Sequence, residues 1–337
     1  MTSVDDRLRR AATSLGQDGE PIPPFKGLRQ RARRRRMMTG AAVVVVAVAG
    51  TFAVAATTRS DRRVNVQQPP PASTTLPSAT TTTAAPKPPV TDRSAVSVYL
   101  ATNEHVVAAG RAVDGAATPE AAVRALLAGP VGVVEEDLGF TSAIPAGTVL
   151  HSVSVDGPVA TVDLSEQFES GGGSLSMQMR VAQVVFTVTQ FAPIDHVRFR
   201  LDGTPVSTIG GEGLMVDNVG RADFADVTPL ILVESPTPGK TVGAPLHVRG
   251  MSNTFEATVN YTLTDSNSPN VCSACAEGVI AEGFTTATAG SGTWGTFEFD
   301  IAFDAERAGP VLLSVYEISA RDGMRINETT IPLEVQP

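Results

Sequence analysis

The side chains with the most reactive chemistry in this sequence belong to Cys272 and Cys275, which are separated by two residues. In a reducing cytosol, a C-x-x-C pair indicates redox or metal chemistry. A redox cysteine is activated at the N-terminus of a helix, whereas this pair lies in a stretch rich in Asn, Ser and Pro between two predicted strands. We therefore predict a structural disulfide between Cys272 and Cys275, with redox activity or two free thiols as the alternatives.

Four histidines are scattered through predicted strands and loops, and no two of them form an H-x-x-x-H or H-E-x-x-H pattern. They are His105, His151, His196 and His247. A zinc site therefore has little support.

Three carboxylates, Asp163, Glu166 and Glu169, follow a predicted strand at loose spacing. This pattern is typical of a solvated acidic rim and not of an acid–base pair.

Two other motifs of catalysis are absent from the sequence, which contains neither a G-x-S-x-G nucleophile turn nor a G-x-x-x-x-G-K phosphate loop. The glycine runs at 171–173 and 210–213 lack a lysine and lack a strand-to-helix context, so we interpret them as turns. The sequence thus predicts no catalytic residue, no cofactor-binding residue and no metal ligand. We expect a protein that is not an enzyme.

The first 57 residues combine a basic arm with an uncharged apolar segment. Residues 1–36 carry ten Lys or Arg against four Asp or Glu, and residues 37–57 carry no charge. As a helix, the apolar segment would span roughly 31 Å, close to the hydrocarbon thickness of a bilayer. The arm ends in a topology signal made of Arg31, Arg33, Arg34, Arg35 and Arg36. By the positive-inside rule, we predict a cytoplasmic tail, one transmembrane helix over 37–57 and exported domains, and hence a single-pass protein of the cell membrane.

Cleavage of the apolar segment is the alternative to an anchor. Ala53, Val54 and Ala55 match the small-x-small pattern of a signal-peptidase site. However, a charged leader of 36 residues is long for a signal peptide, and the apolar stretch exceeds a usual signal-peptide core. We therefore favour an uncleaved anchor.

The segment after the anchor differs in composition from everything that follows. Residues 58–93 contain seven Pro and eight Thr, which predicts a disordered, extended linker. From residue 94 onward the chain carries 11 basic and 29 acidic residues. Such acidic domains argue against nucleic-acid binding, which depends on neutralising phosphates with Lys and Arg.

Residues 94–210 have the pattern of a small α/β domain. Alternating apolar residues predict strands over 94–102, 105–114, 149–156, 159–165 and 196–201. Thr118-Pro119-Glu120 predicts the start of a helix, which Gly129-Pro130 ends. A short helix is expected over 133–138. A longer helix is predicted over 174–191 by the apolar stripe of Leu175, Met179, Ala182, Phe186 and Thr189, although Val and Thr leave a strand possible in its second half.

Residues 229–337 change to short alternating runs separated by Pro, Gly, Asn and Asp, after a connector at 211–228. We predict strands over 231–234, 246–250, 257–263, 280–288, 296–303, 311–319 and 328–335. Seven strands without a helix indicate an antiparallel immunoglobulin-like β-sandwich, and Trp294 is expected to cover its core. The predicted fold class is therefore α+β, with one transmembrane helix and a linker before two domains.

Both domains carry a resemblance to known families. The first, through residues 118–130, 152–168 and 182–206, resembles the GerMN domain, named for a spore-germination and sporulation protein. The second resembles the immunoglobulin-like domain of bacterial spore germination, through residues 231–250, 255–263, 282–303 and 311–335. Their order behind an anchor and a linker is similar to that of actinobacterial envelope proteins. The resemblance implies modules that build rings or scaffolds, and it supplies no catalytic residues.

These observations lead to one leading hypothesis about function and one alternative. We expect a non-enzymatic cell-envelope protein that acts as an extracytoplasmic protein-binding or assembly module. Its expected partners are other envelope proteins, or a second copy bound through the GerMN-like domain. The alternative is a transmembrane signalling protein whose cytoplasmic tail engages a regulator such as a sigma factor.

Overall fold

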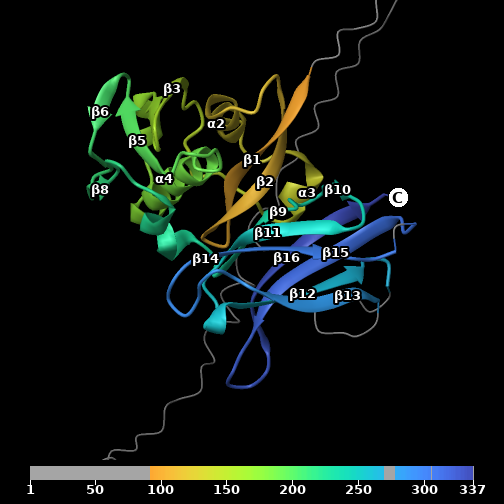
Figure 1. The fold of residues 1–337 in the computed structure, drawn as a ribbon. Coiled ribbons are helices and arrows are strands. Elements are labelled where there is room, and N and C mark those ends of the chain that lie inside the picture. Colours follow the sequence, from red (N-terminus) through yellow and green to blue (C-terminus); the bar gives the residue numbers. More distant parts are fainter. Residues whose placement is uncertain (1–91, 269–277, 305, 337) are drawn as a thin grey trace, which may run out of the picture. The chain divides into compact units, whose positions relative to one another are not determined.

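The computed structural model describes residues 92–268, 278–304 and 306–336, all within one compact unit. The basic arm, the apolar segment and nearly all of the predicted linker lie outside these residues, as do Cys272 and Cys275. Within the described ranges, no helix combines the length and the apolar character needed to cross a bilayer. The described chain is a mixed α+β structure with more strands than helices (Figure 1).

The structure opens with a β-hairpin whose strands match the predicted ones within one residue. Strand β1 (Arg93–Thr102) pairs antiparallel with β2 (His105–Asp114) over ten residue pairs. Asn103 and Glu104 form the two-residue turn between them, with φ values of 47° and 66°. Two positive φ values at the centre of a two-residue loop fit the right-handed twist of the paired strands.

Two helices follow the hairpin, and the sequence signals for both are confirmed. Helix α2 (Pro119–Leu127) begins after Thr118, whose hydroxyl accepts a hydrogen bond from the Ala121 amide at 3.1 Å. This is the expected N-cap geometry. Helix α3 (Gly132–Asp137) is a short second helix within one residue of the prediction.

The α/β half of the chain also contains a four-stranded sheet. Its order is β3-β4-β5-β6, with β3 (Leu150–Asp156), β4 (Val159–Leu164), β5 (His196–Leu201) and β6 (Thr204–Val206). Strands β3 and β4 form the predicted hairpin, whereas β4 and β5 pair in parallel. The connection between the parallel strands contains the 3-10 turn η1 (Glu166–Glu169) and helix α4 (Ser174–Val188).

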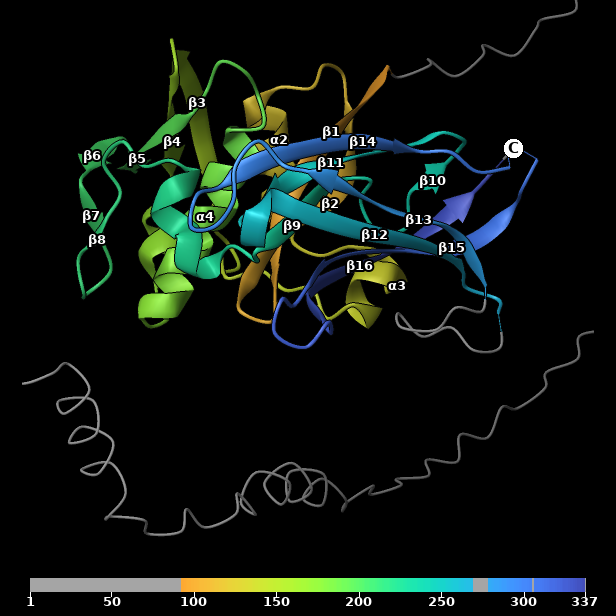
Figure 2. The same cartoon turned by 60° about the horizontal axis from the view of Figure 1, so that its bottom comes forward.

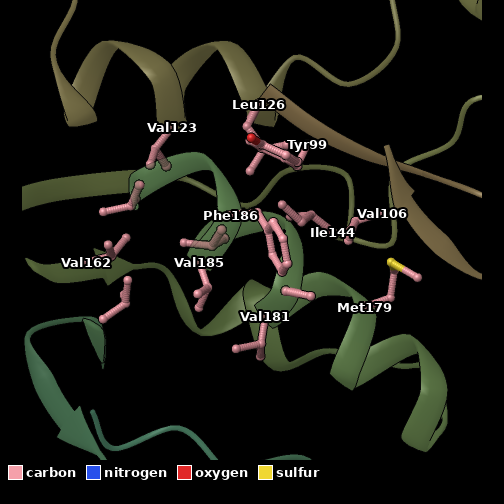
Figure 3. Close-up of a cluster of buried hydrophobic side chains, with 14 of the residues drawn as sticks. Tyr99, Val106, Val123, Leu126, Ile144, Val162, Met179, Val181, Val185 and Phe186 are labelled. Atoms are coloured by element: carbon pink, nitrogen blue, oxygen red, sulfur yellow. The ribbon is translucent and has the colours of Figure 1, made fainter. Parts of the chain in front are cut away.

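Helix α4 forms the centre of the first hydrophobic core. Figures 1 and 2 show it beside the β3–β6 sheet, and Figure 3 shows its Phe186 next to Tyr99 of β1. The two rings lie 5.3 Å apart, and Phe186 is fully buried. The helix continues through Val188, so the alternative of a strand in its second half is wrong. The prediction that Leu175 belongs to the buried stripe is also wrong, because this side chain, in the first turn of the helix, is 44% exposed.

Polar side chains of α4 and of the turn directly after it complete the hydrogen bonding of β1 along the edge that β2 leaves open. Gln190 accepts from the Ser97 amide at 2.9 Å and donates to the Ser97 carbonyl at 2.6 Å. One step along the strand, the Tyr99 amide donates to the Thr187 hydroxyl, and Gln183 donates to the Tyr99 carbonyl at 3.0 Å. A helix thus takes the role of a neighbouring strand and satisfies backbone groups that burial would otherwise leave unpaired.

The second half of the chain is a two-sheet sandwich. One sheet has the order β14-β11-β9 and the other β10-β16-β15-β12-β13. The strands are β9 (Ile231–Ser235), β10 (Thr241–Val242), β11 (Leu246–Ser252), β12 (Thr258–Asp265), β13 (Val279–Thr286), β14 (Gly295–Ile301), β15 (Gly309–Ile318) and β16 (Arg325–Val335). All seven predicted strands are present. The short β10 was not predicted, and because it pairs in parallel with β16 the sandwich is not wholly antiparallel.

The core of the sandwich follows from the alternation in its strands. Val248, Leu263 and Leu313 are fully buried between the two sheets. Trp294 is only half-buried and is not part of this core, contrary to the expectation. The connector before the sandwich contains β7 (Thr208–Ile209), β8 (Leu214–Met215) and the 3-10 segment η2 (Arg221–Val227).

Candidate functional site at the junction of the two halves

Strand β9 belongs to two hydrophobic cores at once. Ile231 and Val233 pack in the core of the sandwich, whereas Leu232 packs in the core of the α/β half. Phe224 and Val227 of η2 belong to that same first core. Because successive side chains of a strand point to opposite faces, β9 joins the halves along its length. The junction is therefore continuous with the packed interior.

Arg221, the first residue of η2, is the polar centre of this junction. Its guanidinium donates to the Glu234 carboxylate of β9 at 2.6 Å and to the Thr189 hydroxyl at 2.8 Å. It also donates to the Phe186 carbonyl at 3.3 Å and lies over the Phe186 ring, 4.8 Å from its centre. One side chain from the connector thus contacts the end of α4 and the first strand of the sandwich.

Tyr99 completes a buried cluster with Arg221 and Glu234. The Tyr99 hydroxyl donates to the same Glu234 carboxylate, and Arg221 stacks against the Tyr99 ring at 5.4 Å. Burial raises the pKa of Tyr99 far above its ordinary value, and the neighbouring Glu234 charge adds to this shift. The phenol therefore stays protonated and acts as a hydrogen-bond donor. We call Tyr99, Arg221 and Glu234 the junction cluster.

The ionisation of Glu234 is shaped by opposing effects. Burial by itself would raise the pKa of Glu234, but the Arg221 charge and the bonds from Tyr99 and Arg221 outweigh it and hold the pKa below its ordinary 4.5. Burial likewise opposes the charge of Arg221, yet Tyr99 and Glu234 raise the pKa of this guanidinium. The pair is therefore fully ionised at neutral pH.

This ionisation predicts that acid weakens the junction. Because the pKa of Glu234 is lower in the folded chain than in the unfolded chain, its contribution to stability is complete above pH 4.5 and is lost as pH falls through the folded pKa. The unfolding free energies of the wild type and of Glu234→Gln should therefore converge as the pH falls below about 4.5. Urea unfolding at several pH values measures this. The exposed Glu212→Gln serves as the control, and a constant gap between wild type and Glu234→Gln would contradict the assignment.

A second ion pair lies beside the junction. Arg111 of β2 binds Glu135 of α3 through two bonds of 2.5 and 2.9 Å, and each side chain is only 9% exposed. Glu135 also accepts from the Val131 amide at 2.7 Å, while Arg111 donates to the Gly129 carbonyl at 3.0 Å. This pair fastens α3 and its preceding loop to the hairpin.

Two cavities open along the junction. One, of about 380 Å³, has mainly apolar walls that include Phe140, Leu232 and Ile331. The other, of about 440 Å³, lies between the hairpin and the segment that follows β9, and its walls include charged side chains. Both volumes fall within the range of small-molecule sites, which often occur where domains meet.

None of the residues singled out from sequence belongs to the junction cluster, although His105 lines the cavity of about 380 Å³. Each of the four histidines contacts a nearby carboxylate or carbonyl, as in the 2.7 Å contact of His151 with Asp202. No group of three or more His, Cys, Asp or Glu within the described ranges could hold a metal. The disulfide predicted for Cys272 and Cys275 and the arginine topology signal fall outside the described residues.

The acidic trio and the glycine runs have structural partners. Asp163 accepts from the Gly203 amide at 3.0 Å, and Glu169 accepts from the Gly210 amide at 2.7 Å. Buried Arg180 donates to the carbonyls of Phe168 and Gly171, at 2.6 and 3.0 Å, and so fixes the first glycine run. The carboxylates of Asp163 and Glu169 thus hold the loops that begin at Gly203 and Gly210.

Sequence reasoning missed all three members of the junction cluster. Arg221 lies in a connector without a periodic pattern, and Tyr99 was only an aromatic residue in a half-buried strand. Glu234 was the one position with a signal, since a carboxylate at the end of the apolar run Ile231–Val233 requires either solvent or a partner. That signal does not name the partner, because Arg221 and Tyr99 are 13 and 135 residues away.

Comparison with known proteins agrees with this architecture. Residues 91–207 match the family model described as sporulation and spore germination, and residues 230–324 match that of the immunoglobulin-like domain of bacterial spore germination. No curated protein matches the chain.

Among solved structures, the tandem GerMN domains of the sporulation protein GerM from Bacillus subtilis are 20% identical, with a TM-score of 0.34. That match covers 63% of this chain and 62% of the GerM structure, so the chain spans less than two thirds of it. The first GerMN domain of GerM alone is 25% identical, with a TM-score of 0.31, and covers 38% of this chain and 98% of that one. A putative lipoprotein from Clostridium perfringens is 20% identical, with a TM-score of 0.28, and covers 40% and 93%. Residues 91–207 therefore form a GerMN-like domain of the sporulation and spore-germination family, and residues 230–324 form the immunoglobulin-like domain of bacterial spore germination.

Proposed function

We propose that this protein is a non-enzymatic assembly module of the cell envelope, anchored by one membrane-spanning segment and a Pro/Thr-rich linker. The uncharged segment at 37–57 and the arginine cluster before it support the anchor and its direction. The family of both domains supports a role in the envelope. In this proposal, the GerMN domain binds other envelope proteins or a second copy of the chain.

The observation that carries this proposal is the junction cluster together with the strand that two cores share. Arg221 contacts α4, β1 and β9, so largely buried bonds fix the two domains to each other. Buried charge-assisted bonds cost more to break than surface ones, and they favour one relative position of the domains. Fixed relative domain positions suit a component that presents one continuous surface to its partners.

The topology can be tested with single cysteines introduced into a chain whose native Cys272 and Cys275 are replaced by serine. A cysteine at Ser3, in the predicted cytoplasmic tail, should be labelled by a membrane-impermeant maleimide only after cells are lysed. A cysteine at the exposed Asp322 should be labelled in intact cells. Labelling of Asp322→Cys only after lysis would contradict export. If a tag is added at the N-terminus, its loss from the mature protein would contradict the anchor.

The binding role can be tested by crosslinking in intact envelopes. The full chain should yield discrete crosslinked products, identified by mass spectrometry as an envelope protein or as the chain itself. A variant lacking residues 94–210 but keeping the anchor, linker and sandwich is the control, and it should lose those products. Identical products from both would contradict binding through the GerMN domain. An altered transcriptional response after deletion of residues 1–25, with crosslinks unchanged, would favour the signalling alternative.

A further inference from the structure

The cavity of about 440 Å³ has an unusual charge for this molecule. From residue 94 onward the chain carries only 11 basic residues against 29 acidic ones, yet three of the basic residues line this one cavity. They are Arg111 of β2, Lys240 in the loop after β9 and Arg249 of β11. The single acidic residue in the lining is Glu234, whose carboxylate is taken up by Arg221 and Tyr99.

Two of these cations have no counter-ion within the described ranges. Neither Lys240 nor Arg249 makes an ion pair there, whereas Arg111 is neutralised by Glu135. Glu298, the residue directly across from Arg249 on β14, binds His247 at 3.0 Å instead. The field of Arg249 does reach Glu234, where it is the smallest of the effects that lower the pKa of that carboxyl. With both acidic neighbours occupied, the walls carry the excess positive charge of Lys240 and Arg249.

The remaining walls supply polar groups and a donor without an acceptor. The residues Ser97, Ser235 and Thr237 place hydroxyl-bearing side chains around the cavity. Arg111, which also lines the cavity, has a buried Nε atom without a hydrogen-bond partner in the described chain.

From this arrangement we infer that the cavity binds a small organic anion, in which a phosphate or carboxylate group is held by Lys240 and Arg249 and a hydroxyl-rich body faces the serines and Thr237. Arg and Lys both form charge-assisted bonds to phosphate and carboxylate oxygens. A cavity of about 440 Å³ is large enough for a ligand of the size of a phosphorylated or carboxylated monosaccharide. The site would be made by residues of both domains and would exist only while the junction is closed. This inference stands apart from the proposed assembly role.

Isothermal titration calorimetry on the full chain in detergent tests it with four probes: inorganic phosphate, glucose 6-phosphate, glucuronate and glucose. At least one of the two charged sugars should bind saturably, and glucose should not. Replacing Lys240 or Arg249 by alanine should weaken binding about tenfold each, the size of one lost charge-assisted bond. Lys240→Arg should keep the affinity, because it keeps the charge.

The control is Arg321→Ala, which removes a 90%-exposed arginine elsewhere on the sandwich and should bind as the wild type does. Far-UV circular dichroism and the unfolding midpoint establish whether the variants are folded. We expect them to fold, because Lys240 and Arg249 are exposed. Absence of binding by both charged sugars, or equal binding by wild type and the Lys240→Ala/Arg249→Ala double variant, would overturn the inference. Binding of inorganic phosphate without either charged sugar would contradict the inference that the ligand has an organic body. Failure here would leave the crosslinking result for the assembly role untouched.

Discussion

Replacing Arg221 by methionine should lower the free energy of unfolding by about 2–4 kcal/mol, because it leaves the Glu234 carboxylate buried without its cation. The Glu234 side chain is 14% exposed and that of Arg221 is 21% exposed. We therefore expect a loss of stability near the lower end of the cost of breaking a buried ion pair. The change also removes the donors to Thr189 and to the Phe186 carbonyl. Methionine keeps the length of the stem, so the effect reports the lost charge and hydrogen bonds rather than a large cavity.

Urea unfolding followed by two probes measures this effect and locates it. Trp294 is the only tryptophan and lies in the sandwich, so its fluorescence reports that domain, whereas far-UV circular dichroism reports both. The two transitions should coincide in the wild type and separate in Arg221→Met, because the variant uncouples the domains. Arg198→Met, which removes an exposed pair with Asp217, is the matched control and should stay within about 0.5 kcal/mol of the wild type. Adding Glu234→Gln should restore part of the loss, and a double variant as unstable as the sum of the singles would rule out direct coupling.

Gln183→Leu should cost about 2–4 kcal/mol, because it leaves two buried backbone groups without partners. Gln183 is fully buried, donates to the Tyr99 carbonyl at 3.0 Å and accepts from the Ala143 amide at 2.8 Å. Leucine has a similar volume, so the loss comes from unsatisfied polar groups and not from packing. The same variant should expose the edge of β1, where α4 stands in for a neighbouring strand.

The free energy of unfolding in urea and amide hydrogen exchange together test this assignment. Exchange of the Ala143 amide should accelerate with the loss of its acceptor, while the amides shared between β1 and β2 change less. Gln178→Leu, on the same helix but only half-buried, is the control for the change of residue type. If Gln183→Leu were as stable as Gln178→Leu, the bonds to β1 would not be a source of stability.

The second prediction concerns the open edge of a two-stranded hairpin. Strand β1 carries buried backbone groups on the edge away from β2, and an unpaired edge is both costly and prone to aggregation. Gln190, directly after α4, pairs with Ser97, and Gln183 of α4 pairs with Tyr99. Thr141 pairs with Ala101 through two backbone bonds of 2.8 Å. The GerMN domain thereby closes its hairpin without adding a strand.

Local signals predicted most of the elements. The Thr118-Pro119 start of α2, the strands on either side of Gly157 and all seven sandwich strands depend on neighbours within a few residues. Each was found within about three residues of its predicted position. Local signals failed where tertiary contacts decide. Leu175 fits the apolar stripe of α4 but lies in a first turn that extends past the core, so it is 44% exposed. Strand β10 is two residues long and exists only because β16 lies beside it.

The sequence by itself predicted the order of the modules and their fold classes, since these follow from periodicity, turn residues and composition, which are local properties. The family resemblance came separately, from its motif residues. The sequence also indicated the anchor and the disulfide, which remain predictions. Only the tertiary structure decided that Tyr99, Arg221 and Glu234 meet, and that Arg111, Lys240 and Arg249 share one cavity. Those groups come from elements up to 138 residues apart, and no local pattern encodes a pairing made by the packing of two domains. Composition predicted acidic domains, and packing placed Lys240 and Arg249, two cations without an ion pair in the described chain, around one cavity.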